Sequence, residues 1–306
     1  MHTTIAALSK TMSEARRVVI LSGAGLSADS GIPIFRDEAS GLWANVDPDE
    51  VVSVRGFENN PDKVWAWHEA MRGLFTRMSP NAGHREIAAL EWLLPRTRVS
   101  VITQNIDGLH QVAGSTRVFE LHGNGLRIRC HHRCGFIAEW PTSQSVNHHC
   151  PSCGAPARPD VVWFGELLDK DQFAFAVKDM LEADIFITVG TSSSVHPAAS
   201  LPLAAKDNGA LLIEINPHPT PISGKADILI RMGASAFFKA LSDALGHGES
   251  SLGWDAGIRW QNLVDQIDKR ALSWLDQNGV CKRASSSQAL RRLFKKSGSN
   301  LGRAVE

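Results

Sequence analysis

Residues 18 to 37 read Val-Val-Ile-Leu-Ser-Gly-Ala-Gly-Leu-Ser-Ala-Asp-Ser-Gly-Ile-Pro-Ile-Phe-Arg-Asp, an apolar run followed by a glycine-rich turn. The run 18–21 is short, apolar and rich in β-branched residues, which is typical of a buried parallel strand. Gly23, Gly25 and Ala28 follow at the G-x-G-x-x-(G/A) spacing of a turn that lets the backbone approach a pyrophosphate. A tight turn without a ligand explains the same spacing about equally well.

The segment after this turn departs from the usual dinucleotide-binding pattern. Gly31 and Pro33 interrupt any helix almost at once. No strand ending in Asp or Glu follows about 20 residues later, where a dehydrogenase holds the adenosine ribose. The phosphate turn is therefore present without the rest of the dehydrogenase signature, and a dehydrogenase is disfavoured.

Length and composition limit the class of protein. With 306 residues the chain can form a large core and a minor domain. Lys plus Arg and Asp plus Glu both number 32, so no overall charge selects nucleic acid or a membrane as partner. The sequence has no apolar run of transmembrane length, and its first residues lack the pattern of a signal peptide. These features predict an intracellular, cytoplasmic protein.

Five short apolar runs have the length and β-branched content of buried strands. They lie at 18–21, 99–103, 185–189 and 211–215, with a weaker one at 228–230. Helical periodicity appears between them, with one apolar face in 84–94 and another in 170–182. This alternation predicts an α/β fold in which a mostly parallel sheet is covered by helices on both sides.

Two insertions interrupt the alternation. Residues 39–80, rich in Trp, Pro and charge, predict a small helical module, and residues 127–157 contain four cysteines. The cysteines form two pairs separated by fifteen residues, which approximates a zinc ribbon: Cys130 and Cys134, then Cys150 and Cys153. Four thiolates close a tetrahedral shell around Zn²⁺, so the metal is expected to stabilise the fold rather than to catalyse. Replacement of one thiolate by His131 or His132 is the alternative.

The carboxyl-terminal part has a different composition. Residues 246–251 have the composition of a linker, residues 258–275 are amphipathic, and the last 25 residues are strongly basic. A basic tail can contact nucleic acid, but a solvated helix face is the favoured interpretation. Nucleic acid is therefore not expected as a partner apart from this tail.

Five further segments occur in a defined order. They are Thr-Gln-Asn-Ile-Asp-Gly-Leu-His at 103–110, Glu-Leu-His-Gly at 120–123, Val-Val-Trp-Phe-Gly-Glu at 161–166, Gly-Thr-Ser-Ser-Ser-Val at 190–195 and Ile-Asn-Pro at 215–217. Together with the first turn, this set resembles the sirtuins, the NAD-dependent protein deacylases. The resemblance covers roughly residues 12 to 242 and is far more specific than any single motif.

The resemblance implies a fold, a cofactor and a kind of substrate. It implies a Rossmann-like domain formed by 1–38, 81–126 and 158–245. It also implies a smaller domain formed by the helical module 39–80 and the zinc ribbon 127–157, and it leaves 246–306 as an extension of unknown role. NAD and an acylated-lysine peptide are expected to meet in the cleft between the domains, with Zn²⁺ in the ribbon.

The same resemblance implies which residues bind NAD. The expected residues are Gly23, Ala24 and Gly25 at the pyrophosphate, Asp29, Phe35 and Arg36 in a loop over the nicotinamide ribose, Gln104, Asn105, Ile106 and Asp107 at that ribose and the nicotinamide, and Gly190, Thr191, Ser192 and Asn216 on the adenosine side.

The chemistry implied by the resemblance needs a base. An amide oxygen is a poor nucleophile, so ribose C1′ must develop cationic character as nicotinamide leaves, and a dry, oriented site favours that step. A base must then activate a ribose hydroxyl, a role that suits a histidine and that the resemblance gives to His122, with Asn105 and Asp107 as its catalytic neighbours. His110 is the rival histidine and is interpreted as a packing or hydrogen-bonding residue. The products would be lysine, nicotinamide and O-acyl-ADP-ribose.

The substrate residues include a departure from part of the family. Val162, Trp163, Phe164, Gly165 and Glu166 are expected to pair with the substrate backbone by strand addition. Sirtuins that remove succinyl or malonyl groups have Tyr-x-x-Arg where this chain has His68 and Met71, so an uncharged acyl group is predicted. A register shift of one residue would place Arg72 in the site and favour desuccinylation. Mono-ADP-ribosyl transfer and a non-catalytic NAD-binding module are the other hypotheses.

Overall fold

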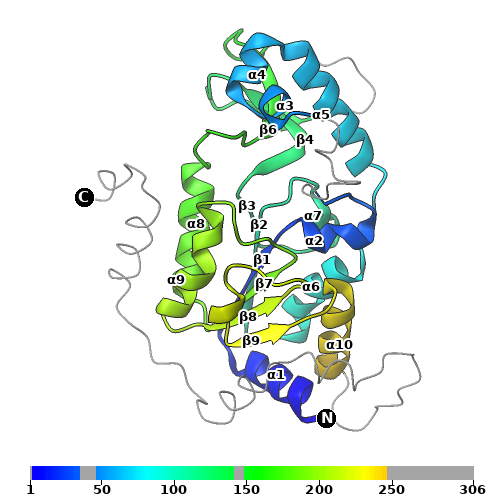
Figure 1. The fold of residues 1–306 in the computed structure, drawn as a ribbon, viewed down its shortest axis with the longest axis vertical. Coiled ribbons are helices and arrows are strands. Elements are labelled where there is room, and N and C mark those ends of the chain that lie inside the picture. The colour runs from blue at the N-terminus through cyan, green and yellow to red at the C-terminus, as the bar shows by residue number, and fades with distance from the viewer. Residues whose placement is uncertain (1, 35–45, 141–147, 247–306) are drawn as a thin grey trace.

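The structure is a computed structural model that describes residues 2–34, 46–140 and 148–246. The predicted lid residues Phe35 and Arg36 lie outside the described residues, as does the extension from 247 to 306. The elements form two sheets of unequal size, each with its own helices (Figure 1).

A six-stranded parallel sheet forms the larger part, in the order β3-β2-β1-β7-β8-β9. Its strands are β1 (Arg17–Ser22), β2 (Arg98–Thr103), β3 (Val118–Glu120), β7 (Ile185–Val189), β8 (Leu211–Ile215) and β9 (Ile228–Ile230). All five predicted strands are therefore confirmed, whereas β3 was missed because its three residues, Val-Phe-Glu, include only two apolar ones. The chain starts in the middle of the sheet and builds outward in both directions. The switch in strand order lies between β1 and β7, which is where open α/β sheets bind ligands.

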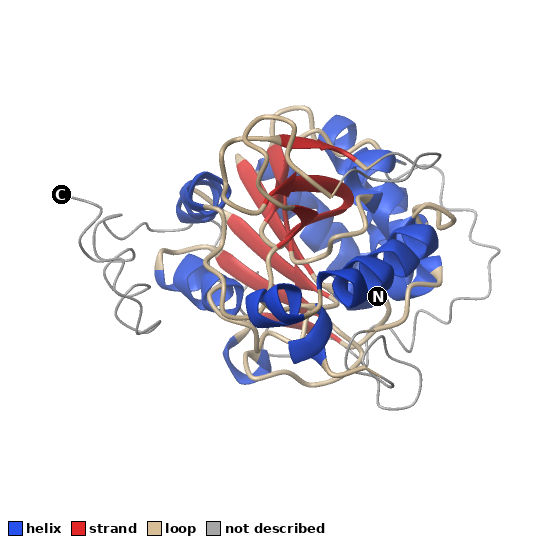
Figure 2. Cartoon of the chain, turned by 90° about the horizontal axis from the view of Figure 1, so that it is seen from above, coloured by secondary structure: helices blue, strands red, loops and turns tan. Residues whose placement is uncertain are grey.

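Helices cover both faces of this sheet, as the alternation predicted (Figures 1 and 2). The helices on one face are α1 (His2–Glu14), α6 (Ala82–Leu93) and α10 (Ala234–Gly246), and those on the other are α8 (Lys170–Leu181) and α9 (Leu201–Asp207). Along β1, Val18 and Ile20 belong to the first core cluster, and Val19 and Leu21 belong to the second. A strand buried on both faces needs apolar residues at every position, which explains its unbroken apolar run.

The smaller part combines three helices with an antiparallel sheet. Its elements are α3 (Pro48–Val51), α4 (Val54–Asn59), α5 (Pro61–Phe75), β4 (Gly123–Cys130), β5 (Ile137–Glu139) and β6 (Ala157–Val161), the strands lying in the order β5-β4-β6. Val64 and Trp65 of α5 share a buried cluster with Trp140 and Trp163. The helical module and the cysteine segment thus share one core. β4 and β6 extend past the boundaries predicted at 126 and 158, and the boundaries themselves stay a prediction.

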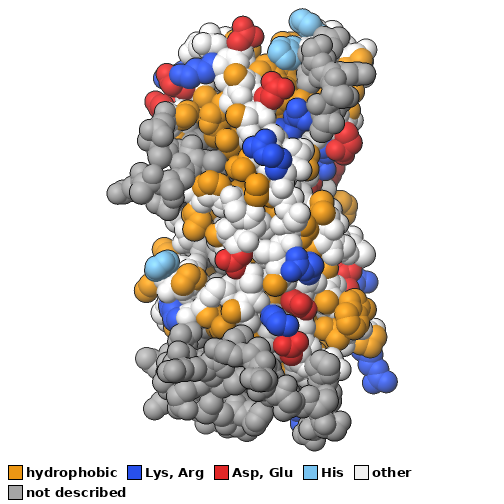
Figure 3. Space-filling view, turned by 90° about the vertical axis from the view of Figure 1, so that its right-hand side faces the viewer, with side chains coloured by type: hydrophobic (Ala, Val, Ile, Leu, Met, Phe, Trp, Pro, Cys, Tyr) orange, Lys and Arg blue, Asp and Glu red, His pale blue; other side chains and the backbone are white. Residues whose placement is uncertain are grey.

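Short elements complete the described chain. They are α2 (Ala24–Ser27), α7 (Leu109–Val112) and the 3-10 helices Ala28–Ser30, Ala198–Ser200 and Ser223–Lys225. Among the described residues, none of the helices has both the length and the apolar content needed to cross a bilayer. Acidic and basic side chains are intermixed on the face in Figure 3, in keeping with the balanced charge.

The glycine-rich turn after β1 lies directly against the turn after β7. The Gly25 N–H donates to the Gly190 carbonyl at 2.8 Å. A Cβ at Gly23 would lie 2.8 Å from Gly190 O, and a Cβ at Gly190 would lie 2.4 Å from Leu26 N. Gly190 also has a φ of +59°, in the left-handed region. The glycine spacing is thus required by contact between two protein loops, whatever ligand the turn binds.

We expect Gly190→Ala to lower the free energy of unfolding by at least about 2 kcal/mol, because a side chain there adds a backbone clash to an unfavourable φ. Urea-induced unfolding measures this cost. Gly114→Ala is the matched control, since its φ is +101° but nothing lies within 4 Å of an added Cβ; about 1 kcal/mol is expected there. Equal costs at the two positions would show that the loop crossing tolerates a side chain.

Candidate active site

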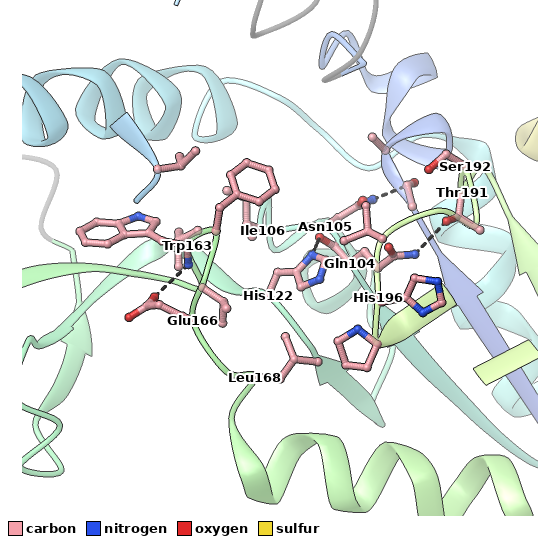
Figure 4. Close-up of a pocket in the computed structure, with 18 of the residues that line it drawn as sticks. Gln104, Asn105, Ile106, His122, Trp163, Glu166, Leu168, Thr191, Ser192 and His196 are labelled. Carbon is pink, nitrogen blue, oxygen red and sulfur yellow. Dashed lines mark hydrogen bonds between the residues drawn. The ribbon is translucent and has the colours of Figure 1, made fainter. Parts of the chain in front are cut away.

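A cavity of about 310 Å³ lies where the carboxyl ends of β1, β2 and β7 face the smaller sheet. Its wall includes Gly23 and Ala24 after β1, Gln104, Asn105 and Ile106 after β2, Gly190, Thr191 and Ser192 after β7, His122 before β4, and residues 161–166 after β6. Figure 4 shows Trp163 and Glu166 on one side of His122, with Thr191 and His196 on the other. Residues predicted from five separate segments therefore meet around one cavity.

Hydrogen bonds fix Asn105 and Asp107 behind the first turn. Asn105 Nδ2 donates to the Gly23 carbonyl at 3.1 Å and to Ser27 Oγ at 3.0 Å. Ser27 Oγ donates in turn to Asp107 Oδ2 at 2.7 Å. Both hydrogens of the Asn105 amide are used within the protein, so its oxygen is the atom that this side chain can offer to a ligand.

Asp107 has a supporting position in this structure. Its side chain is buried and is not among the described residues that line the cavity. Burial raises the pKa of its carboxyl group, while the hydrogen bonds from Ser27 and Leu109 oppose that rise. Its two carboxylate oxygens accept from Ser27 Oγ and from the Leu109 N–H, and the contact with the ribose that the sequence predicts stays a prediction.

Gln104 connects the loops after β2 and β7. Its Nε2 donates to Thr191 Oγ1 at 2.8 Å, and Asn216 Nδ2 donates to the Thr191 carbonyl at 2.9 Å. Thr191 thus receives hydrogen bonds from two other loops. Asn216 and Gly25 are not among the described lining residues, and Asp29 is exposed on the 3-10 helix after α2.

His122 lines the cavity and has a defined tautomer. Its Nδ1 lies 3.0 Å from the Gln104 carbonyl, which can only accept, so Nδ1 carries the proton and Nε2 is the basic nitrogen. Burial lowers the pKa of His122, and the bond to the Gln104 carbonyl only partly offsets this. The imidazole is therefore neutral at neutral pH, which is the form that a general base needs.

Gly123 makes the turn that places His122. β3 ends at Glu120 and β4 begins at Gly123, whose φ is +80°. A Cβ at Gly123 would lie 2.1 Å from the Asp160 carbonyl on β6. Glycine is thus required next to His122 for the close approach of the two strands.

The rival His110 lies away from the cavity. Its Nε2 is 2.8 Å from Ser22 Oγ, and its ring is 5.0 Å from that of His84. Burial lowers the pKa of His110 to about 3, with the nearby His84 adding to the effect. The interpretation of His110 as a hydrogen-bonding residue is confirmed.

Most backbone N–H groups of the predicted substrate segment already donate to groups of the protein. The Val162 N–H donates to the His122 carbonyl at 2.9 Å, and the Phe164 N–H donates to the Val52 carbonyl at 2.9 Å. The Trp163 N–H donates to the Glu166 carboxylate at 2.9 Å. The Glu166 N–H also donates to the Trp163 carbonyl at 3.0 Å, so the pairing with a substrate strand that the sequence predicts would use other backbone groups of this segment, and it stays a prediction. The Glu166 carboxylate is engaged within the protein, by the Trp163 N–H and by ion pairs with Arg129, Arg133 and Arg158.

The predicted acyl-group residues are placed differently from the expectation. His68 is buried, its Nδ1 is 3.0 Å from the Val64 carbonyl, and its Nε2 accepts from Trp163 Nε1 at 3.3 Å. The pKa of His68 falls to about 3 because burial disfavours the charged ring; the Val64 carbonyl opposes this shift and the nearby Arg158 adds to it. Neither His68 nor Met71 is among the described lining residues, and His68 contacts the lining residue Trp163 from behind.

Arg72, the alternative acyl-group residue, is not among the described residues that line the cavity. Its guanidinium lies 5.1 Å from the ring centre of Trp140, and its Nη2 is 3.7 Å from Glu69. Trp67, rather than either predicted residue, brings α5 to the cavity.

Several lining residues were missed in the sequence. They are Ile34, Val52, Trp67, Val161, Leu168, Val195, His196 and Pro197. Most of them adjoin a recognised segment, so proximity in the chain is the signal that could have found them. Val52 has no such neighbour and reaches the site only through the fold.

The four cysteines converge as a metal site. Their sulfur atoms all lie within 4.8 Å of one another, with 3.5 Å between Cys130 and Cys153 and 3.5 Å between Cys134 and Cys150. Tetrahedral Zn–S bonds of about 2.3 Å place sulfur atoms about 3.8 Å apart, so this set fits Zn²⁺. No histidine belongs to the cluster among the described residues.

We expect one zinc ion per chain and a structural role for it. Cys134→Ser should abolish stoichiometric zinc, measured by atomic emission, and lower the melting temperature by several degrees, because one of four ligands is lost. Cys281→Ser is the control, since Cys281 lies outside the described residues and four thiolates already complete the shell. Full zinc content in Cys134→Ser would contradict the assignment.

Comparisons with known proteins agree on one family. The Sir2 family model matches residues 23–197. NAD-dependent protein deacylase 1 of Caldanaerobacter subterraneus is 44% identical over 233 residues, which is 75% of this chain and 94% of that protein. The NAD-dependent protein deacylase of Mycobacterium tuberculosis is 46% identical over 235 residues, 75% of this chain and 98% of that protein.

Solved structures show the same relationship. A Sir2 homologue in complex with NAD is 39% identical, has a TM-score of 0.72, and covers 78% of this chain and 93% of its own. A Sir2 protein with a deacetylated peptide and 3′-O-acetyl ADP-ribose is 31% identical, has a TM-score of 0.69, and covers 79% of this chain and 98% of its own. This chain belongs to the Sir2 family, the sirtuins.

Proposed function

We propose that the protein is an NAD-dependent protein-lysine deacylase that releases nicotinamide and O-acyl-ADP-ribose. The observation that carries the proposal is the neutral His122, whose Nδ1 proton is held by the Gln104 carbonyl while its ring lines the cavity. The names of the relatives and the structures solved with NAD and with a deacetylated peptide support the same conclusion.

The lining residues have separate roles in this proposal. NAD supplies the ribose carbon that takes the acyl oxygen once nicotinamide leaves. The turns at Gly23 and Gly190 bring backbone to the NAD phosphates, and Gln104 and Asn105 orient the ribose beside His122. His122 Nε2 takes the proton of a ribose hydroxyl, and the Gln104 carbonyl stabilises the imidazolium that results.

The acyl group is proposed to be uncharged. Val52, Ile106 and Trp163 give the cavity apolar surface, and no lysine or arginine of the described chain lines it. Both ring nitrogens of His68 are engaged by Val64 and Trp163. A succinyl or malonyl carboxylate would lose water there without gaining a cation, which is unfavourable.

The cytoplasmic location, the domain boundaries and the individual roles of the NAD residues stay proposals. A contact between the basic tail and nucleic acid concerns residues outside the described part of the chain.

We expect the acid limb of the pH profile to lie below 6.5, the ordinary pKa of histidine. Burial lowers the pKa of His122, so its basic form persists to lower pH than in a free histidine, and deacylation is lost only as the pH falls through that lowered value. The profile of kcat/KM for an acetyl-lysine peptide at saturating NAD measures this. An acid limb above 6.5 would contradict the assignment of His122 as the base.

A panel of acetyl-, hexanoyl- and succinyl-lysine peptides with NAD tests the function as a whole. Mass spectrometry should detect O-acyl-ADP-ribose from the first two peptides and at least about 100-fold less from the succinyl peptide. His122→Asn should lower the rate by a factor of about 10² to 10⁴. Efficient desuccinylation would refute the proposed acyl preference, ADP-ribose on protein would indicate ADP-ribosyl transfer, and no nicotinamide release would indicate a binding module.

A further inference from the structure

One buried arginine lies directly behind the cavity wall. Arg158, on β6, has a side-chain exposure of 0%, and its guanidinium carbon is 3.2 Å from the ring centre of Trp163. Trp163 lines the cavity and is itself 2% exposed. Arg158 therefore touches the wall from the protein side and has no contact with the space that a substrate would fill.

Arg158 holds the backbone around Trp163 as well as the Trp163 ring. Nη1 and Nη2 donate to the two Glu166 oxygens at 2.8 and 2.9 Å, and Nη2 also donates to the Val161 carbonyl at 2.7 Å. The same Glu166 carboxylate accepts the Trp163 N–H at 2.9 Å. One guanidinium thus fixes the ring, the backbone and the flanking residue of Trp163, which requires the planar fork that arginine has and lysine lacks.

Residues of the helical module also contact the Trp163 indole on the side away from the cavity. Trp163 Nε1 donates to His68 Nε2, and the Phe57 ring centre is 5.2 Å from that of Trp163. Arg129 and Arg133, from the cysteine segment, lie 3.4 and 3.8 Å from the Glu166 carboxylate. The wall is therefore connected to α5 on one side and to the cysteine segment on the other.

We infer that Arg158 is a positioning residue for the acyl-binding wall: together with Glu166 it fixes Trp163 and thereby sets peptide affinity and acyl-chain selectivity, while NAD binding is independent of it. The inference rests on the proposed function, since Trp163 meets an acyl chain only if the cavity takes acyl-lysine. NAD affinity is independent because the turns at Gly23 and Gly190 belong to the larger sheet.

Arg158→Lys tests this with a matched control elsewhere in the molecule. Arg117 makes the same kind of two-pronged pair, with Nε and Nη2 at 2.6 and 2.8 Å from Asp179, and neither residue lines the cavity among the described residues. Both Arg158→Lys and Arg117→Lys should lower the melting temperature. Only Arg158→Lys should raise the KM for an acetyl-lysine peptide about tenfold and reduce the preference between acetyl and hexanoyl chains, with the KM for NAD changed less than about twofold.

Two results would overturn the inference. The first is that Arg158→Lys keeps the wild-type KM for the peptide and the wild-type acyl preference. The second is that Arg158→Lys raises the KM for NAD by the same factor as the KM for the peptide. If Arg158→Lys does not fold, Glu166→Gln is the second variant. Glutamine keeps an acceptor for the Trp163 N–H but loses the charge that Arg158 binds. A KM for the peptide within twofold of wild type in Glu166→Gln would then overturn the inference. A wild-type protein that releases no nicotinamide refutes the proposed function instead.

Discussion

The crossing of two backbone loops is the constraint on which the rest of the site depends. The turn after β1 is held by the Gly23 N–H on the Val189 carbonyl and the Gly25 N–H on the Gly190 carbonyl. This crossing fixes Thr191, which accepts Gln104 Nε2, and the Gln104 carbonyl in turn fixes Nδ1 of His122. The orientation of the proposed base His122 thus depends on the loops after β1, β7 and β2. It begins at the contact between Gly25 and Gly190, where no side chain fits.

Much of the larger sheet could be predicted from the sequence because strands buried on both faces leave an unbroken apolar run. The run 18–21 and its counterparts specified the sheet, whereas β3 has three residues and no such run. In the site, the loops after β1, β2 and β7 could be placed because parallel strands bring their carboxyl ends to one edge. The directions of side chains could not be predicted in this way. Glu166 turns toward Arg158, and His68 lies behind Trp163, because partners far away in the chain satisfy them.

Charge is kept away from the cavity by pairing and by burial. Glu166 is the charged residue among the described lining residues, and Arg158 neutralises it from behind. Burial lowers the pKa of His68 to about 3 and that of Arg158 to about 10, so the first is neutral and the second remains charged at neutral pH. Arg129, Arg133 and Arg158, the described cations that reach the Glu166 carboxylate behind the wall, are therefore already paired with a group of the protein. Such a site favours the departure of a neutral group from NAD and disfavours an anionic acyl chain.

The larger sheet orients the ring of the proposed base, and the smaller part supplies most of the apolar wall beside it. The His122 ring and Asn105 are oriented by loops of the larger sheet, while the His122 backbone is held next to β4 and β6 by the Val162 N–H. Trp67 and Trp163 come from α5 and the segment after β6. A change at His68 alters what lies behind the indole without altering any hydrogen bond to His122. The zinc ribbon fits this division, since its Arg129 and Arg133 reach Glu166 and so stiffen the wall rather than the proposed base.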